Sequence, residues 1–380
     1  MGADAAPHER VYMRSSMCRS AVSLALLVLM TAGVAAAQTS YPNVKIVGRL
    51  QVEFYDFNNG DNAIYAAIPT RAAESNFLVR RARITAKGNL TENISFVIQP
   101  SYTTGQSGLI LKDAYLDVAF TKPEAKSAFV LRAGQFKRFF GRYELTSSNN
   151  LPSIERGAYR GLVPVSSNDL AIGNGFAAHD LGAGLIYTGM EKKLSIMGSV
   201  MNGALSPNNL DINNSKSYYA RATYAVTPKL SIGGSFASHD FIQTVDTFPA
   251  DSSAMNTGWG VDAQWGAPGN EGLYVMGDYM SGESILNSAN KIWGIQGVAA
   301  YNIRMKSPDS FLYAIEPAFR YDLAEPNNSV VNDQSTLITA GVNFYLSSKA
   351  QFRLMYESQS FEQSDLKTIS GVRTALTMNF

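Results

Sequence analysis

The sequence is poor in the residues that build metal and redox sites. Its only cysteine is Cys18, and its three histidines are His8, His179 and His239. A single cysteine excludes an internal disulfide, and neither paired cysteines nor an H-x-x-x-H spacing is present for zinc. Charged residues make up 17% of the chain, below the roughly 25% usual in globular domains. These absences predict a protein without metal, cofactor or thiol chemistry.

Long apolar runs and an excess of one charge are also missing after residue 37. No segment there approaches the ~18 apolar residues of a membrane helix. Residues 38–380 carry 29 basic and 29 acidic side chains, because the first 37 residues hold three arginines, Asp4 and Glu9. Without a dominant basic stripe, nucleic acid is not an expected partner.

The first 37 residues have the pattern of a secretory signal peptide. Arg10, Arg14 and Arg19 precede the apolar stretch Ala21–Met30, and Ala35–Ala37 supplies small residues for cleavage. A membrane anchor is the alternative, but the apolar stretch is too short. Translation from Met1 or from Met13 would both leave this pattern intact. We therefore expect a cleaved leader over residues 1–37 and a single domain over residues 38–380.

Residues 38–380 alternate apolar and polar side chains with a period of two, in segments bounded by turn residues. Sixteen strands of about the length that a tilted strand needs to cross a bilayer are predicted. Their ranges are Val44–Phe57, Asn76–Gly88, Glu92–Tyr102, Leu109–Phe120, Ala128–Phe136, His179–Thr188, Lys193–Asn202, Lys216–Val226, Lys229–His239, Thr257–Trp265, Leu273–Met280, Ile292–Ile303, Phe311–Tyr321, Thr336–Leu346, Gln351–Ser358 and Ser370–Phe380.

Short and long connections alternate between these strands, which places every short turn at one end of the sheet. Outer-membrane barrels have this arrangement, with short periplasmic turns and longer external loops. A soluble sandwich would share the alternation of faces but has no reason to sort its turns. Aromatic residues also gather at strand ends on the apolar face, as membrane interfaces require. The sequence therefore predicts an all-β fold, a 16-stranded antiparallel transmembrane β-barrel.

The alternation assigns a face to each side chain. In the second strand we expect Leu78, Ala82 and Ile84 to face lipid while Arg81 and Arg83 face the interior. Proline removes a hydrogen bond from the ladder, so a β-bulge is expected at Pro317.

Sixteen strands leave an aqueous channel unless something fills it. Residues Phe139–Ala178 form the third external loop, and its length suggests a functional element. Between Lys137 and Arg160 only Glu144 and Glu155 oppose the bases, which are Lys137, Arg138, Arg142, Arg156 and Arg160. We expect this loop to fold inward and narrow the pore.

Interior charges follow from the same alternation. The bases on interior positions are Lys45, Arg49, Arg81, Arg83, Lys87, Arg132, Arg221, Arg320, Arg353 and Arg373. The acids are Glu53, Asp113, Asp117, Asp180, Asp262, Asp278, Glu316 and Glu357. Basic side chains around a narrow low-dielectric passage concentrate anions. A simpler interpretation is that many of them pair across strands and serve only as scaffold.

Four segments together resemble the phosphate-selective porin O and P family. They are FLVRRARITAKGNLTENISFVIQPSY (Phe77–Tyr102), LKDAYLDVAF (Leu111–Phe120), GQFKRFFGRYELTSSNNLPSIER (Gly134–Arg156) and the terminal GVRTALTMNF. The resemblance implies a homotrimeric barrel in the outer membrane of a Gram-negative-type bacterium, with the third loop folded inward. It also implies that Arg81, Arg83, Lys137 and Arg156 guide anions.

The sequence thus predicts a porin, not an enzyme, for passive diffusion of small hydrophilic solutes with a bias toward anions such as phosphate. Its expected partners are outer-membrane lipid and small anions. Two alternatives stay open, a structural or adhesive barrel with a closed pore and an outer-membrane acyl hydrolase. The hydrolase would need a serine beside a histidine. His179 and His239 lie near strand ends, where we expect them at the surface.

Overall fold

The computed structural model describes residues 41–58, 75–106, 108–122, 127–157, 163–203, 211, 215–242, 253–307 and 310–380. The predicted leader over residues 1–37 lies outside the described residues. No helix in the described part of the chain is long and apolar enough to cross a membrane.

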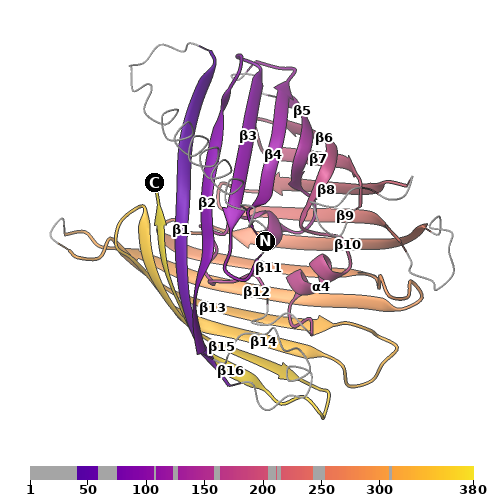
Figure 1. The fold of residues 1–380 in the computed structure, drawn as a ribbon, viewed down its shortest axis with the longest axis vertical. Helices are drawn as coiled ribbons and strands as arrows, with labels where there is room; N and C mark the ends of the chain where they lie inside the picture. Colours follow the sequence, from indigo (N-terminus) through magenta and orange to yellow (C-terminus); the bar gives the residue numbers. More distant parts are fainter. Residues whose placement is uncertain are drawn as a thin grey trace, which may run out of the picture. The chain divides into compact units, whose positions relative to one another are not determined.

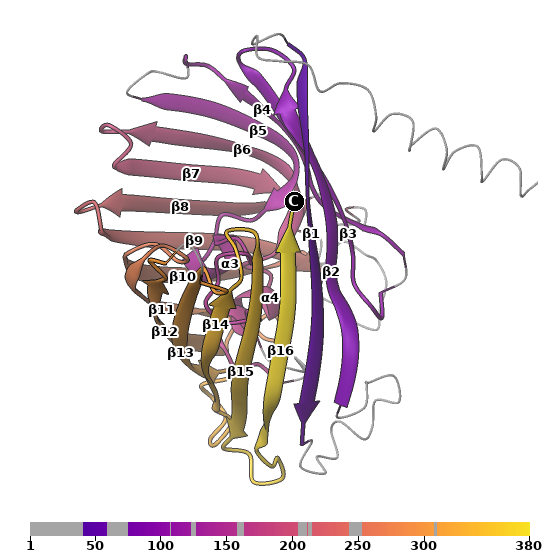
Figure 2. The same cartoon turned by 90° about the vertical axis from the view of Figure 1, so that its left-hand side faces the viewer.

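In the described ranges, sixteen antiparallel strands form one closed barrel, in which β1 pairs with both β2 and β16 (Figures 1 and 2). The strands are β1 (Asn43–Phe57), β2 (Ser75–Asn89), β3 (Ile94–Tyr102), β4 (Ile110–Ala119), β5 (Ala128–Lys137), β6 (His179–Gly189), β7 (Leu194–Met201), β8 (Ser217–Ala225), β9 (Leu230–Ile242), β10 (Ser253–Trp265), β11 (Gly272–Glu283), β12 (Lys291–Arg304), β13 (Ala314–Glu325), β14 (Ser335–Tyr345), β15 (Ala350–Phe361) and β16 (Ile369–Asn379). The predicted fold class is confirmed. Several strands, such as β9 and β13, extend beyond their predicted ends toward the longer connections.

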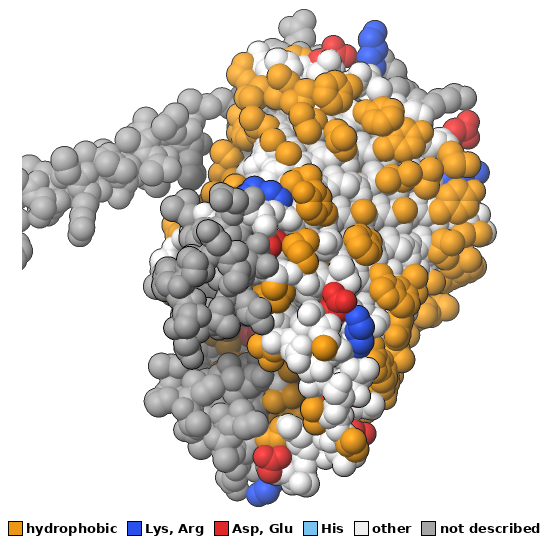
Figure 3. Space-filling view, turned by 90° about the vertical axis from the view of Figure 1, so that its right-hand side faces the viewer, with side chains coloured by type: hydrophobic (Ala, Val, Ile, Leu, Met, Phe, Trp, Pro, Cys, Tyr) orange, Lys and Arg blue, Asp and Glu red, His pale blue; other side chains and the backbone are white. Residues whose placement is uncertain are grey.

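Alternation along each strand separates an apolar outer face from a polar inner face. In β16, Val372, Leu376 and Met378 are exposed, whereas Arg373 and Thr377 are buried. Figure 3 shows one side of the molecule, where apolar side chains are spread over the described surface and few charged side chains lie among them. A charge on such a face would cost about 2–4 kcal/mol at the bilayer midplane.

Two β-bulges interrupt this alternation, and neither lies at Pro317. The β1–β2 register shifts between Gln51 and Val52, and the β3–β4 register shifts between Gln99 and Pro100. Around Pro317 the β13 pairs with β12 and β14 keep one register, so the predicted bulge there is wrong. Pro100, which also lacks an N–H group, lies at the second shift instead.

The first bulge also reverses a predicted face. Arg80 is the extra residue on β2, because Gln51 pairs with Arg81 and Val52 pairs with Val79. Beyond it, Leu78 packs against the buried cluster of Tyr55, Phe57 and Ile369, whereas Phe77 is exposed. The expectation that Leu78 faces lipid is therefore wrong, since one inserted residue exchanges the two faces of a strand.

The connection between β5 and β6, here called the β5–β6 loop, comprises the described residues 138–157 and 163–178. It contains the short helices α3 (Arg142–Leu145) and α4 (Ser167–Gly173). The Ser166 hydroxyl caps α4 by accepting a hydrogen bond from the Asp169 N–H at 3.0 Å. Helix α4 lies beside β11, β12 and β13 (Figures 1 and 2).

Apolar side chains of this loop pack against buried side chains of the far strands. Phe140, Leu170 and Phe176 join Met280 and Ile292 in one cluster. Tyr143 and Leu151 join Met276 and Val298 in a second cluster, and Ile154 joins Met355 in a third. The loop is therefore attached by apolar contacts to the wall formed by β11–β15.

Candidate functional site: a basic cavity beside β1–β5

A cavity of about 720 Å³ lies between strands β1–β5 and the β5–β6 loop. The wall side is lined by β1 and β2 (Arg49, Arg83), β3, β4 and β5, and the loop side by Ser147–Asn149, Glu155–Gly157 and the start of α4. Its described lining contains nine bases and four acids. The bases are Arg49, Arg80, Arg81, Arg83, Lys87, Lys112, Arg132, Lys137 and Arg156.

A row of like-charged cross-strand pairs runs along β1 and β2. Lys45 pairs in register with Lys87, and Arg49 pairs with Arg83. Like charges directly opposite each other destabilise a sheet. Arg49 donates to the Ser148 hydroxyl at 2.6 Å, and Arg83 donates to the Ser101 hydroxyl at 3.2 Å. In the part of the chain that the structure describes, neither arginine has a carboxylate partner, so their charge stays directed at the cavity.

The two bulges place two further bases in the cavity lining, which the alternation of the sequence does not predict. Arg80 and Lys112 are the extra residues of the two register shifts, and both line the cavity. Strict alternation would place each beside an inward-facing neighbour, on the lipid side. The adjacent pair Arg80–Arg81 and the strand proline Pro100 are the signals that could have revealed them.

The carboxylate of Glu155 in the β5–β6 loop forms ion pairs with Arg80 and Arg81. The Arg80 Nε–Glu155 distance is 2.8 Å, and the Arg81 Nη2–Glu155 distance is 3.0 Å. Burial by itself would raise the pKa of Glu155, but Arg80, Arg81 and Arg373 outweigh it and hold that pKa well below its usual range. The loop is thus tied to the β2 wall by an ionised carboxylate at any physiological pH.

A second group of ion pairs connects the end of β5 with two residues of the β5–β6 loop. Glu144 of α3 contacts Lys137 at 2.8 Å and Arg156 at 3.4 Å. Burial acts to raise the pKa of Glu144, but Lys137 and Arg156 outweigh it and lower the pKa from 4.5 to about 2. The ionised form is therefore favoured in the folded loop. The stabilisation is complete above about pH 4.5 and is lost only as the pH falls toward 2.

Replacing Glu144 by glutamine is expected to raise the preference for anions, because Lys137 and Arg156 lose the charge that neutralises them. Reversal potentials across a planar bilayer in a KCl gradient would measure this. In the parent protein Glu144 stays ionised between pH 5 and pH 8, so its titration should not change the reversal potential over that range. A shift of the variant toward cations would contradict the assignment.

The predicted site residues divide into two groups. Arg49, Arg81, Arg83, Lys87, Asp113, Arg132, Lys137 and Arg156 line the cavity. The described cavity lining does not include Lys45, Glu53, Asp117, Arg138, Arg142, Arg221, Arg320, Arg353 or Arg373. Arg160 lies outside the described residues. Sequence alternation alone could not separate these groups, because both face the barrel interior.

Most of the second group form ion pairs. Arg138 pairs with Asp180 at 2.9 Å, Arg221 with Asp262 at 2.7 Å, and Arg320 with Asp322 at 2.5 Å. Arg142 also pairs with Asp262, and Arg373 lies between Glu53 and Glu357. The simpler interpretation of the sequence, that interior charges pair with each other as scaffold, therefore holds for these side chains.

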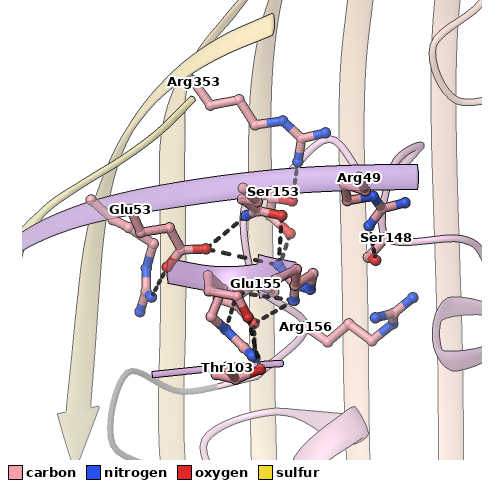
Figure 4. Close-up of polar contacts among 12 residues, drawn as sticks. Arg49, Glu53, Thr103, Ser148, Ser153, Glu155, Arg156 and Arg353 are labelled. Carbon is pink, nitrogen blue, oxygen red and sulfur yellow. Dashed lines mark hydrogen bonds and ion pairs between the residues drawn. The ribbon is translucent and has the colours of Figure 1, made fainter. Parts of the chain in front are cut away.

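Three side chains of the far wall anchor the loop by donating hydrogen bonds to its backbone carbonyls. Arg320 donates to the Glu155 carbonyl at 2.9 Å and to the Arg156 carbonyl at 2.5 Å. Arg353 donates to the Ser153 carbonyl at 3.2 Å and to the Asn149 carbonyl at 3.1 Å. Asn343 donates to the Pro152 carbonyl at 2.9 Å. Figure 4 shows Arg353 above Ser153, with Glu155 and Arg156 further along the same segment.

Neither His179 nor His239 is an exposed surface residue. His239 is fully buried against Tyr219 and Ser217, and His179 contacts Asp113 at 3.4 Å beside the cavity. The expected surface placement of His239 is therefore wrong. Ser217 and His239 do touch, but both are completely buried, so a substrate has no access to them. No group of three or more His, Cys, Asp or Glu side chains in the described ranges is placed to hold a metal ion.

The sequence matches the phosphate-selective porin O and P family over residues 44–303, which is more than half of the chain. The chain belongs to this family. Family and barrel together make it an outer-membrane porin. No curated protein matches it.

Solved structures with the same fold are distant in sequence. The anion-selective porin from Comamonas acidovorans superimposes with a TM-score of 0.61 at 11% identity, over 89% of this chain and 99% of that chain. The outer membrane channel DcaP of Acinetobacter baumannii gives 0.58 at 11% identity, over 91% and 100%. OmpT of Vibrio cholerae in its trimer form gives 0.53 at 12% identity, over 89% and 99%. At these identities the likeness shows the fold alone.

Proposed function

We propose that this porin passes small hydrophilic solutes by passive diffusion, with a preference for small anions such as phosphate, through the cavity beside β1–β5. The observation that carries the proposal is the excess of bases without a carboxylate partner. Among the described residues, Arg49, Arg83, Lys87 and Lys112 line the cavity and form no ion pair with an acid. Their field in a narrow passage raises the local concentration of anions.

The β5–β6 loop is the element that narrows this passage. Its apolar side chains pack on the β11–β15 wall, its backbone carbonyls accept hydrogen bonds from Arg320 and Arg353, and Glu155 reaches Arg80 and Arg81 on β2. These contacts with opposite walls support a segment that crosses the interior and leaves space on the β1–β5 side. Steric filtering by the loop and electrostatic attraction by the wall then act at the same place.

Export and assembly complete the proposal. Residues 1–37 act as a cleaved leader that directs the chain to the outer membrane, and the mature protein forms a homotrimer. The charge and apolar pattern of the leader supports the first statement. The family, and the trimer form of OmpT of Vibrio cholerae, support the second.

Conductance and ion selectivity of the purified protein in planar bilayers test the proposed function. Ohmic steps are expected, with a reversal potential of anionic sign in a KCl gradient. A cation-selective reversal potential would overturn the anion preference, and the absence of steps would favour the closed structural barrel. A decrease of chloride current with added phosphate would place phosphate among the solutes.

Cysteine labelling tests the position of the β5–β6 loop. Residues 38–380 contain no cysteine, so Ser147→Cys introduces one thiol on an exposed loop residue that lines the cavity. Reaction with 2-sulfonatoethyl methanethiosulfonate is expected to lower the single-channel conductance, because a bulky group then lies in the passage. The matched control is Ser348→Cys in the turn between β14 and β15. Equal responses of the two variants would argue against the loop as the constriction.

A further inference from the structure

The described residues at the rim, where the longer connections begin and end, are mostly acidic, in contrast to the cavity lining. Beyond the Arg138–Asp180 pair, three described bases lie there, Lys216, Lys291 and Lys367. Eight described acids lie there: Asp56, Asp211, Asp240, Glu283, Glu325, Asp333, Glu362 and Asp365. Lys216 and Lys291 already pair with Asp211 and Glu283. Among the described residues of the rim, carboxylates therefore outnumber bases.

Two of these carboxylates are buried together. Glu325 ends β13 and Asp333 lies two residues before β14, and they are 5% and 8% exposed. The β13–β14 ladder ends with Ala324 paired to Ser335, which brings Glu325 and Asp333 to the same end of this hairpin. Burial, together with the neighbouring carboxylates of Glu325 and Glu362, raises the pKa of Asp333. The Glu362 N–H donates to the Gln334 carbonyl at 2.9 Å, which brings the β15–β16 connection against this pair. The acids come from two neighbouring connections.

No described side chain of the protein neutralises the negative charge of Glu325 and Asp333. Among the described residues, Glu325 accepts one backbone hydrogen bond, from the Asn327 N–H at 3.0 Å, and Asp333 Oδ1 is buried without a hydrogen-bond partner. No ion pair between either carboxylate and a base occurs in the described ranges. Two neighbouring buried carboxylates without a base are strongly unfavourable when both are ionised. Either a proton or a cation from solution has to relieve the repulsion.

We propose that Glu325 and Asp333 bind a hydrated divalent cation, Mg²⁺ or Ca²⁺, which joins the β13–β14 and β15–β16 connections at the outer rim. Hard cations take oxygen ligands, and Mg²⁺ in particular keeps several waters and uses one or two carboxylates. Asp333 Oδ1 is the ligand atom that the protein itself leaves unused. Because water completes the coordination shell, affinity in the millimolar range is expected, which suits a site that faces the external medium.

Hydrogen exchange of the β13–β14 connection tests the site in the intact protein. At pH 8 and constant ionic strength, MgCl₂ or CaCl₂ is compared with EDTA. Amides of residues 326–334 should exchange about fivefold more slowly when the cation is at four times its dissociation constant. Asp333→Asn and Glu325→Gln should abolish this response, and in EDTA both should exchange more slowly than the parent because the repulsion is gone. Asp365→Asn, on the same rim but exposed, should keep the full response.

Three results would overturn the site. One is a parent protein whose exchange is unchanged by 10 mM of either cation, which would leave the proton as the occupant of the pair. Another is a cation response that survives in Asp333→Asn. The third is a response that is lost equally in Asp365→Asn, which would indicate general screening of the acidic rim. None of these results bears on ion selectivity, so the site and the proposed function fail independently.

Discussion

Replacing Arg49 and Arg83 together by glutamine is expected to lower the anion-to-cation permeability ratio at least about fivefold. Each substitution removes a full charge from the cavity without leaving a carboxylate unpaired. One unit charge at 4 Å is worth about 1 kcal/mol even in bulk water, which is roughly a fivefold change in local ion concentration. Reversal potentials in a tenfold KCl gradient give the ratio directly.

The matched control removes the same charge outside the cavity. Lys192→Gln with Lys193→Gln changes the turn between β6 and β7, where both side chains are exposed. This variant should keep the reversal potential of the parent at 0.15 M salt, because charges beyond about 8 Å are screened. If both double variants behave alike, Arg49 and Arg83 are not in the path of the current.

Lys137 and Arg156 are less informative targets, although the resemblance points to them. Both neutralise Glu144, and Arg156 also donates to the Tyr143 carbonyl at 3.2 Å. Changing either one alters selectivity and loop stability together. Arg49 and Arg83 are better targets, because among the described residues they donate only to the hydroxyls of Ser148 and Ser101 and their replacement breaks no ion pair of the loop.

Replacing Arg320 and Arg353 together by methionine is expected to give larger and noisier conductance steps. These side chains donate four hydrogen bonds to carbonyls between Asn149 and Arg156. Hydrogen bonds to charged groups contribute about 1.5–3 kcal/mol each. The loss should raise the population of detached loop by two orders of magnitude or more. Single-channel recording measures both the mean conductance and its fluctuation.

The single variant Arg353→Met separates detachment from a buried charge. Arg320 also pairs with Asp322, whereas Arg353 binds only carbonyls among the contacts of the described residues. Gln359→Met is the control, since Gln359 is a buried side chain of the same strand and has no hydrogen bond to the described loop. Unchanged conductance in Arg353→Met and in the double variant would mean that the apolar contacts alone hold the loop.

The sequence by itself determined the barrel, its sixteen strands and the sorting of its turns. This succeeded because the period of two is a local property: each residue of a regular strand faces opposite to its neighbour, whatever lies far away in the chain. The sequence did not determine where β9 and β13 end. Pairing continues there past the apolar segment that the membrane dictates.

Only the tertiary structure decided which interior charges remain available to a solute. Arg80 and Lys112 line the cavity because single inserted residues on β2 and β4 change the facing of the strand, and the pairing partner, not the local pattern, fixes where that insertion occurs. Arg138, Arg221 and Arg320 are neutralised by Asp180, Asp262 and Asp322. The Coulomb energy of such a pair depends on the distance between its two charges. That distance is set by strand register and by contacts between residues remote in sequence, so it is determined only when the sheet has closed.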